Sequence, residues 1–256
     1  MISISAMKKF ILYFFILLLV LSCKNEPYFL TKIEGKQLPV TEGINSKKEI
    51  EDFIKPYKES VDKEMNTIIS YTTSNLVRTD GELESSLGNL MADLCFEKAN
   101  PIFKSRNGKN IDFALFNYGG IRAGITQGNI TTQNAFNLMP FENNLVVVEL
   151  SSQKIEELVQ YLIKENKANP ISKHVQLVIT KSGYTLKIKN QLLDKNKTYF
   201  VLTSDYLQNG GDHMNFFKDP INLYPIDYKI RSAIIDYLKE TDTIKVNLDG
   251  RFRIEK

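Results

Sequence analysis

The stretch Asp112-Phe-Ala-Leu-Phe-Asn-Tyr-Gly-Gly-Ile-Arg122 decides how the rest of the chain is organised. Its apolar residues predict a short buried strand, and the paired glycine predicts a tight turn that delivers an arginine. The pattern returns later, where the β-rich run 198–203 leads into Tyr206-Leu-Gln-Asn-Gly-Gly-Asp212. Strands that end in a glycine turn and a charged residue often present polar groups to a ligand. The simpler alternative is two glycine turns with solvated charges.

Composition places the chain among ordinary globular proteins and argues against a polyanionic partner. Its 256 residues are 43% hydrophobic and 25% charged, which is enough for one good core. The formal charge is +3, but Lys8 and Lys9 lie in the N-terminal leader, so the remainder is close to neutral. A nearly neutral surface provides no strong attraction for a phosphate backbone. We therefore expect no nucleic acid polymer as a partner.

The N-terminus has the pattern of a bacterial lipoprotein leader. The basic Met7-Lys-Lys9 precedes an apolar run, 10–21, which is short for a membrane-spanning helix but of signal-peptide length. The run closes on Val20-Leu-Ser-Cys23, which resembles a lipobox. We expect a signal peptide over 1–22, lipidation of Cys23 and a tether over 23–45. The alternative is a plain secretory signal in which Cys23 stands by chance.

That interpretation predicts a lipid-anchored membrane protein of the bacterial cell envelope, either periplasmic or surface-exposed. The second cysteine, Cys95, lies in an apolar run with helical spacing, where a thiol is usually a small core residue rather than a nucleophile. Since lipid would occupy Cys23, we expect no disulfide between the two.

Helical and strand patterns alternate from residue 46 to the C-terminus. We expect amphipathic or apolar helices over 46–68, 84–99, 151–163 and 227–238, and strands over 69–78, 145–150, 174–181, 184–188, 198–203 and within 243–254. Alternating helices and strands without internal repeats predict one mixed α/β domain over 46–256.

The sequence contains no recognisable catalytic motif. Its two histidines, His174 and His213, are too few for a dinuclear metal phosphoesterase site. There is neither a Gly-x-Ser-x-Gly elbow nor a P-loop, and although a Ser-His-Asp triad stays open, nothing marks its nucleophile. We therefore expect no catalytic residue, metal site or cofactor in this chain itself.

Side chains that can bind a ligand, in contrast, are present at several turns. Arg122 can pair with a carboxylate or phosphate, and Asn117 can contact a base edge or a ribose hydroxyl. Phe141 and Tyr206 stand at turns and can stack on a flat ring, and Asp212 can accept two hydroxyl hydrogens of a ribose. Each aromatic residue taken alone is more often part of a core. The supporting turns are expected at Gly119, Gly120, Gly210 and Gly211.

Four motifs in order carry a family resemblance: Glu84-x-x-Leu-Gly-Asn89, Asn117-Tyr-Gly-Gly-Ile-Arg122, Met139-Pro-Phe141-Glu-Asn143 and Tyr206-Leu-Gln-Asn-Gly-Gly-Asp212. Together they resemble the C-terminal, substrate-binding domain of the 5'-nucleotidases, over about residues 48 to 255. The resemblance implies a four-layered α/β fold that clamps a nucleoside. It also implies that Phe141 and Tyr206 stack on the base, Asp212 holds the ribose, and Asn117 and Arg122 contact the ligand.

The sequence departs from that family in four places. The usual N-terminal metallophosphatase domain is not seen, Leu83 stands where a ligand arginine is usual, and Tyr118 and His213 replace small residues. The resemblance therefore implies nucleotide recognition for a 5'-nucleotidase-type hydrolase, with a separate metallophosphoesterase chain that carries divalent metals. Two alternatives stay open: a non-catalytic envelope lipoprotein that binds nucleosides or nucleotides, and an interaction domain with an idle pocket. Whether this chain counts as an enzyme is left open.

Overall fold

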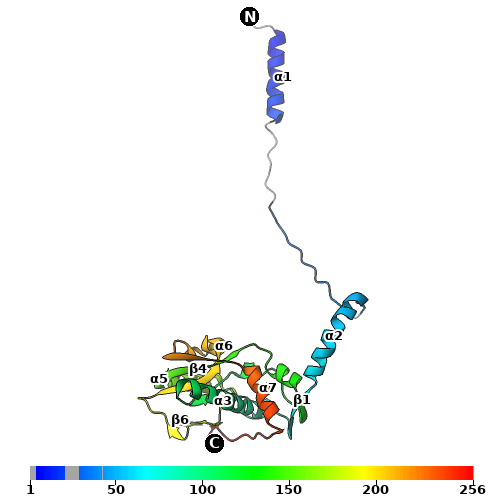
Figure 1. Ribbon diagram of the computed structural model, residues 1–256. Coiled ribbons are helices and arrows are strands. Elements are labelled where there is room, and N and C mark those ends of the chain that lie inside the picture. Colours follow the sequence, from blue (N-terminus) through cyan, green and yellow to red (C-terminus); the bar gives the residue numbers. More distant parts are fainter. Residues whose placement is uncertain (1–3, 21–28, 42, 256) are drawn as a thin grey trace. The chain divides into compact units, whose positions relative to one another are not determined.

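The computed structural model describes residues 4–20, 29–41 and 43–255 (Figure 1). The chain divides into two compact units, Met1–Glu51 and Asp52–Lys256. The first unit contains helix α1 (Ile4–Val20), and the described part of its tether, 29–41, has no helix or strand. Among the described residues, no helix combines the length and apolarity needed to cross a membrane. Cys23, the predicted lipidation site, lies outside the described residues.

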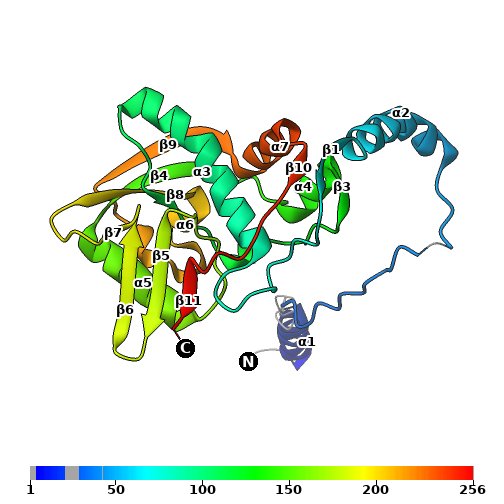
Figure 2. The same ribbon diagram turned by 90° about the horizontal axis from the view of Figure 1, so that it is seen from below.

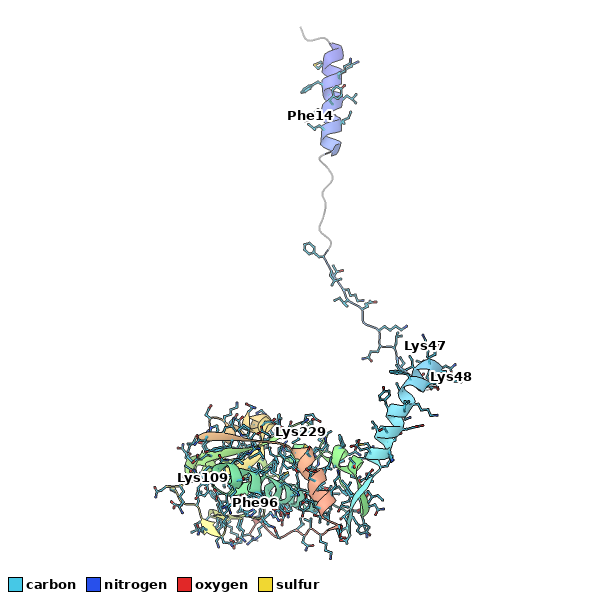
Figure 3. All side chains as sticks on the ribbon, viewed as in Figure 1. Phe14, Lys47, Lys48, Phe96, Lys109 and Lys229 are labelled. Atoms are coloured by element: carbon cyan, nitrogen blue, oxygen red, sulfur yellow. The ribbon has the colours of Figure 1, made fainter. Side chains whose placement is uncertain are left out.

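Helix α2 (Lys48–Met65) confirms the amphipathic helix expected near residue 46. Pro56 lies inside the helix and does not end it. Five apolar side chains of α2 are exposed, those of Ile50, Phe53, Ile54, Tyr57 and Val61, and in the described chain none of its residues is buried. Figure 3 shows these side chains as sticks, with Lys47 and Lys48 labelled at the start of the helix.

A four-stranded sheet forms the centre of the second unit. Its strands are β2 (Phe113–Ala114), β8 (Thr198–Ser204), β4 (Asn144–Ser151) and β9 (Asn222–Lys229), in that spatial order. Strand β2 runs parallel to β8, and the other neighbours are antiparallel. Because β2 and β8 are parallel neighbours, the segments that follow them leave the sheet at the same edge. This pairing is what brings the two glycine motifs together.

Both faces of this sheet are covered, since β4 and β8 are buried along almost their whole length. Helix α3 (Ser86–Asn107) packs on β2 and β9, and α5 (Ser152–Glu165) packs on β4 and β8. Continuous burial of β-branched and aromatic residues accounts for the apolar runs seen in the sequence.

Two smaller sheets flank the central one. The first has the order β11 (Phe252–Ile254), β5 (Val175–Thr180), β6 (Gly183–Ile188) and β7 (Gln191–Leu192), and Figure 2 shows β11 beside β5. The second has the order β10 (Thr243–Ile244), β1 (Ile68–Thr72) and β3 (Gly128–Thr131). The remaining helices are α4 (Thr132–Leu138), α6 (Asp205–Gln208) and α7 (Ile230–Glu240), with 3-10 turns η1 (Tyr118–Gly120), η2 (Gly211–His213) and η3 (Asn215–Phe217). These sheets and helices confirm the mixed α/β class.

The start of α3 follows from its sequence. The Ser85 hydroxyl accepts a hydrogen bond from the Gly88 amide at 3.1 Å, which caps the helix. A Cβ on Gly88 would lie 2.7 Å from that hydroxyl oxygen, so glycine at this position leaves room for the cap. Cys95 on the same helix is fully buried, and burial raises the pKa of its thiol well above the usual range. Its predicted role as a core residue is confirmed.

Arg251 joins the C-terminal segment to α3. Its side chain is only 5% exposed and contacts Asp93 at 3.1 Å and Asp249 at 2.6 Å. It also donates to the Ile171 carbonyl at 2.9 Å. Burial opposes ionisation of Asp249, but the charge and hydrogen bonds of Arg251 outweigh it and hold the pKa of that carboxyl below its usual range.

Three predicted boundaries were wrong. The helix expected from residue 227 begins at Ile230, because the preceding residues complete β9, a strand that the sequence pattern did not predict. Helix α3 continues to Asn107, past Pro101, and ends at Gly108 in the left-handed conformation. The strand expected over 69–78 ends at Thr72, and only Leu76 continues the pairing, as an isolated bridge to Ile125.

Candidate ligand-binding pocket

A pocket of about 280 Å³ opens where the segments after β2 and β8 leave the sheet. It brings together all five predicted side chains, Asn117, Arg122, Phe141, Tyr206 and Asp212, with Gly119, Gly120 and Asn143. Asn143 ends the third motif, but it was not predicted as a binding residue. The structure thus gathers in one place residues up to 95 positions apart in the sequence.

Asp212 is the centre of the hydrogen bonding in this pocket. Its Oδ2 accepts a hydrogen bond from Asn117 Nδ2 at 2.6 Å, and its Oδ1 accepts one from the Tyr206 hydroxyl at 2.9 Å. The Asp212 amide in turn donates to the Tyr206 hydroxyl oxygen at 3.3 Å. The hydrogen bond to Asp212 raises the pKa of Tyr206, so its hydroxyl is a stable donor at neutral pH.

The glycines are needed for close approach. A Cβ on Gly120 would lie 2.8 Å from Asn117 Oδ1, and one on Gly211 would lie 2.4 Å from ring atoms of Tyr206. Gly210 has a φ of +88°, a left-handed conformation that favours glycine. These contacts give a physical reason for Gly120 in the first motif and for both glycines of the second.

The backbone of η2 is held by a residue that the sequence analysis did not select. Asp212 and His213 have φ angles of 50° and 60°, which are unusual for residues with a side chain. The hydroxyl of Tyr161, on α5, donates to the Asp212 carbonyl at 2.8 Å. Tyr161 lies on the face of α5 that packs toward η3. In the sequence it looks like any other residue of a packed helix face, so nothing marks it as part of the site.

The two aromatic residues of the pocket are not core residues. Phe141 is 41% exposed and Tyr206 is 45% exposed, whereas Phe113 and Phe116 nearby are 1% exposed. The guanidinium carbon of Arg122 lies 5.9 Å from the centre of the Phe141 ring. The core alternative is therefore wrong for both rings, and a flat ligand can reach them beside a positive charge.

Arg78, which does not line the pocket, supports the first glycine turn. It donates to the Ile121 carbonyl at 2.7 Å, and its guanidinium carbon lies 4.4 Å from the centre of the Tyr118 ring. Leu83, which stands where relatives were expected to have an arginine, is 1% exposed and belongs to the core. Arg78 was not predicted, because in the sequence it is a single arginine before the Glu84 motif with no pattern around it.

A second hollow of about 510 Å³ adjoins the pocket and shares Tyr206 and Asp212 with it. Gly210, Gly211 and His213 line this hollow rather than the pocket itself. Lys167 also lines it and pairs with Glu165 at 2.8 Å, so its charge is already partly balanced.

His174 lies elsewhere, stacked on Phe96 with ring centres 3.8 Å apart. Burial lowers the pKa of His174. In the described residues, no three or more histidine, cysteine or acidic side chains are placed to hold a metal ion together. The pocket thus offers stacking faces, a carboxylate, an amide and a guanidinium, which are groups for recognition.

Residues 64–219 match the family model described as "5'-nucleotidase, C-terminal domain". An apyrase of Tabanus yao is 26% identical over 230 residues, which cover 80% of this chain and 41% of the apyrase. A trifunctional nucleotide phosphoesterase of Bacillus subtilis is 29% identical over 238 residues, covering 84% of this chain and 16% of that protein.

Solved structures agree on the fold. The 5'-nucleotidase precursor from Thermus thermophilus superposes with a TM-score of 0.67 at 25% identity, over 80% of this chain and 42% of that one. A putative 5'-nucleotidase from Staphylococcus aureus gives a TM-score of 0.56 at 15% identity, over 88% and 46% of the two chains. This chain therefore spans less than half the length of these relatives.

Proposed function

The chain belongs to the family of 5'-nucleotidase C-terminal domains, and from this premise we propose that it binds a nucleoside or nucleotide in the pocket beside η1 and η2. We further propose that it supplies this recognition to a 5'-nucleotidase-type hydrolase in nucleotide breakdown. The hydrolytic step is assigned to a separate metallophosphoesterase chain that carries divalent metals.

One observation carries the binding proposal: two exposed aromatic rings, a hydrogen-bonded carboxylate and an arginine share one pocket. A flat base can stack on Phe141 and Tyr206. The Asp212 carboxylate retains free lone pairs that can accept ribose hydroxyls. Arg122 provides a positive charge for a phosphate.

The proposal of a separate catalytic partner rests on the relatives of this chain and on the side chains of its pocket. The matched relatives carry names of nucleotide hydrolases, and the residues they share with this chain make up less than half of their length. A dinuclear phosphoesterase site needs clustered histidine and acidic ligands, whereas the pocket of this chain presents aromatic rings, a carboxylate, an amide and a guanidinium. We therefore assign recognition to this chain and metal chemistry to its partner.

Calorimetry with adenosine, AMP and UDP-glucose tests the binding proposal. Since each base–aromatic stack contributes about 1–3 kcal/mol, the Phe141→Ala and Tyr206→Ala double variant should lose measurable binding. Tyr71→Ala, which changes an exposed aromatic residue of β1 that does not line the pocket, is the matched control and should bind as the wild type does. Equal binding by the double variant would overturn the proposal.

An assay of AMP hydrolysis distinguishes the proposed function from its alternative. The chain should accelerate AMP hydrolysis by a metallophosphoesterase encoded beside it, and the double variant should not. If the chain binds nucleotides but leaves the partner's rate unchanged, it is a non-catalytic binding lipoprotein. That second function is favoured by the recognition-only chemistry of the pocket.

We also propose that the protein is lipid-anchored in the bacterial cell envelope through Cys23. Fractionation tests this directly: Cys23→Ser should release the protein from membranes, because lipid cannot be attached to serine. Cys95→Ala is the control and should stay in the membrane fraction, since Cys95 is buried in the core. Retention of Cys23→Ser in membranes would contradict the proposal.

A further inference from the structure

Asp212 is held at three points by other side chains, and we propose that the hydroxyls of Tyr161 and Tyr206 are positioning groups that preset it to accept a vicinal diol. Tyr206 holds the carboxylate and Tyr161 holds the backbone. The ligand in this inference rests on the proposed function, whereas the positioning itself is a property of the free chain.

The backbone needs such support. Asp212 has a φ of 50° and His213 a φ of 60°, and two successive left-handed residues without glycine are held only where their surroundings favour them. The Tyr161 hydroxyl reaches the Asp212 carbonyl at 2.8 Å. The Tyr161 ring is itself fixed by edge-on packing against Phe216, with ring centres 5.4 Å apart. Tyr161 thus ties the strained turn to the rigid helix α5.

The carboxylate is oriented from both sides. Asn117 donates to one oxygen and the Tyr206 hydroxyl to the other, which fixes the plane of the carboxylate. Each carboxylate oxygen can accept about two hydrogen bonds. One acceptor position therefore remains on each oxygen, and two such positions in one plane suit two adjacent hydroxyl groups.

Tyr206 cannot easily move away from this position. Its ring lies against Gly211, where an added Cβ would come within 2.4 Å of the ring atoms. The Asp212 amide also donates to the Tyr206 hydroxyl oxygen at 3.3 Å. The Tyr206 hydroxyl therefore donates one hydrogen bond to Asp212 and accepts another from it. The ring that offers a stacking face and the hydroxyl that orients the acid are thus fixed together.

Both hydroxyls remain protonated at neutral pH. Burial and the nearby charges of Glu165 and Asp212 raise the pKa of Tyr161 to about 12. The pKa of Tyr206 is raised by its hydrogen bond to Asp212.

Tyr161→Phe and Tyr206→Phe remove one oxygen each and keep both rings, which separates positioning from stacking. Tyr228→Phe is the matched control, because the Tyr228 hydroxyl also donates to an aspartate, Asp236, at 2.5 Å, and neither residue lines the pocket. The chain contains no other change in these variants, so differences report on the hydroxyl alone.

The first measurement needs no ligand. Hydrogen–deuterium exchange of the amides in 210–214 should be about tenfold faster in Tyr161→Phe and Tyr206→Phe, since a hydrogen bond to a charged or strained group is lost. Tyr228→Phe should leave this segment unchanged. Wild-type exchange rates in both pocket variants would overturn the inference.

The second measurement compares adenosine with 2',3'-dideoxyadenosine, which lacks both hydroxyls. Each pocket variant should lower the affinity ratio of the two nucleosides by about tenfold, mainly through weaker adenosine binding. An unchanged ratio would overturn the diol assignment, even if both affinities fell. If the wild type binds neither nucleoside, the proposed function fails, and the exchange rates alone then decide whether the two tyrosines position Asp212.

Discussion

Gly211 lines the hollow beside the pocket and has no room for an added side-chain atom, because the Tyr206 ring lies against it. A methyl group there would lie 2.4 Å from the Tyr206 ring, so Gly211→Ala must displace the ring. We expect adenosine affinity to fall about tenfold and the free energy of unfolding to fall by about 1–2 kcal/mol. Calorimetry and urea denaturation measure the two effects.

Gly35→Ala is the control for this change, because an added Cβ there meets no described atom within 4 Å and the backbone is not left-handed. Gly35→Ala should alter neither the adenosine affinity nor the free energy of unfolding. Unchanged adenosine binding by Gly211→Ala would show that the ring can move without loss.

His174 should make stability depend on pH. Burial lowers its pKa in the folded state, so the unfolded chain binds the proton more readily. The native state therefore loses stability as pH falls below about 6.5, the ordinary pKa of histidine, toward the lowered folded value. His174→Phe should lose less stability than the wild type between pH 7 and pH 5, as measured by urea midpoints. Parallel pH profiles of the two proteins would contradict this assignment.

At the scale of single elements, the N-terminus of α3 allows a direct test. The Ser85 hydroxyl caps this helix by accepting from the Gly88 amide, and Ser85 is 1% exposed. Ser85→Ala should reduce the free energy of unfolding by about 1–2 kcal/mol, because the Gly88 amide loses its partner away from water. Urea denaturation measures the loss, with exposed Ser182→Ala as the control. Equal stability of both variants would show that the cap is dispensable.

Elements with a strong pattern were predictable from the sequence. The apolar runs of β4 and β8 and the amphipathic face of α5 are buried as expected, since burial on one or both faces leaves a clear periodicity. Strand β9 was not predictable in this way. It contains Pro225, lies at the sheet edge and pairs only with β4, so most of its residues remain partly exposed.

The candidate pocket was predictable only where the chain carries a local motif. Glycine pairs and their flanking residues marked Asn117, Arg122, Tyr206 and Asp212, all of which line the pocket. Arg78 and Tyr161 act on backbone carbonyls of segments distant in the sequence. Such contacts need a long side chain at the right place in space and impose no spacing that a single sequence reveals.

At the scale of the whole second unit, Arg251 connects three segments that are far apart in the chain. Arg251→Ala would remove the partner of Asp93 and Asp249 and one hydrogen bond to Ile171. Since both acids are partly exposed, we expect a loss of about 3 kcal/mol, at the lower end of the range for broken buried pairs. Thermal or urea unfolding measures it. Arg253→Ala, whose side chain donates only to the Gly250 carbonyl, is the control and should change stability little.

The burial of Cys95 has a practical consequence for spectroscopy. The chain has two cysteines, and Cys95 is 0% exposed with a thiol whose pKa is raised by burial, so it reacts slowly with labelling reagents. In a Cys23→Ser background, a cysteine introduced on the surface would be the one reactive thiol. A fluorophore or spin label could then be attached at a chosen position without further changes to the core, and ligand arrival at the pocket could be followed in real time.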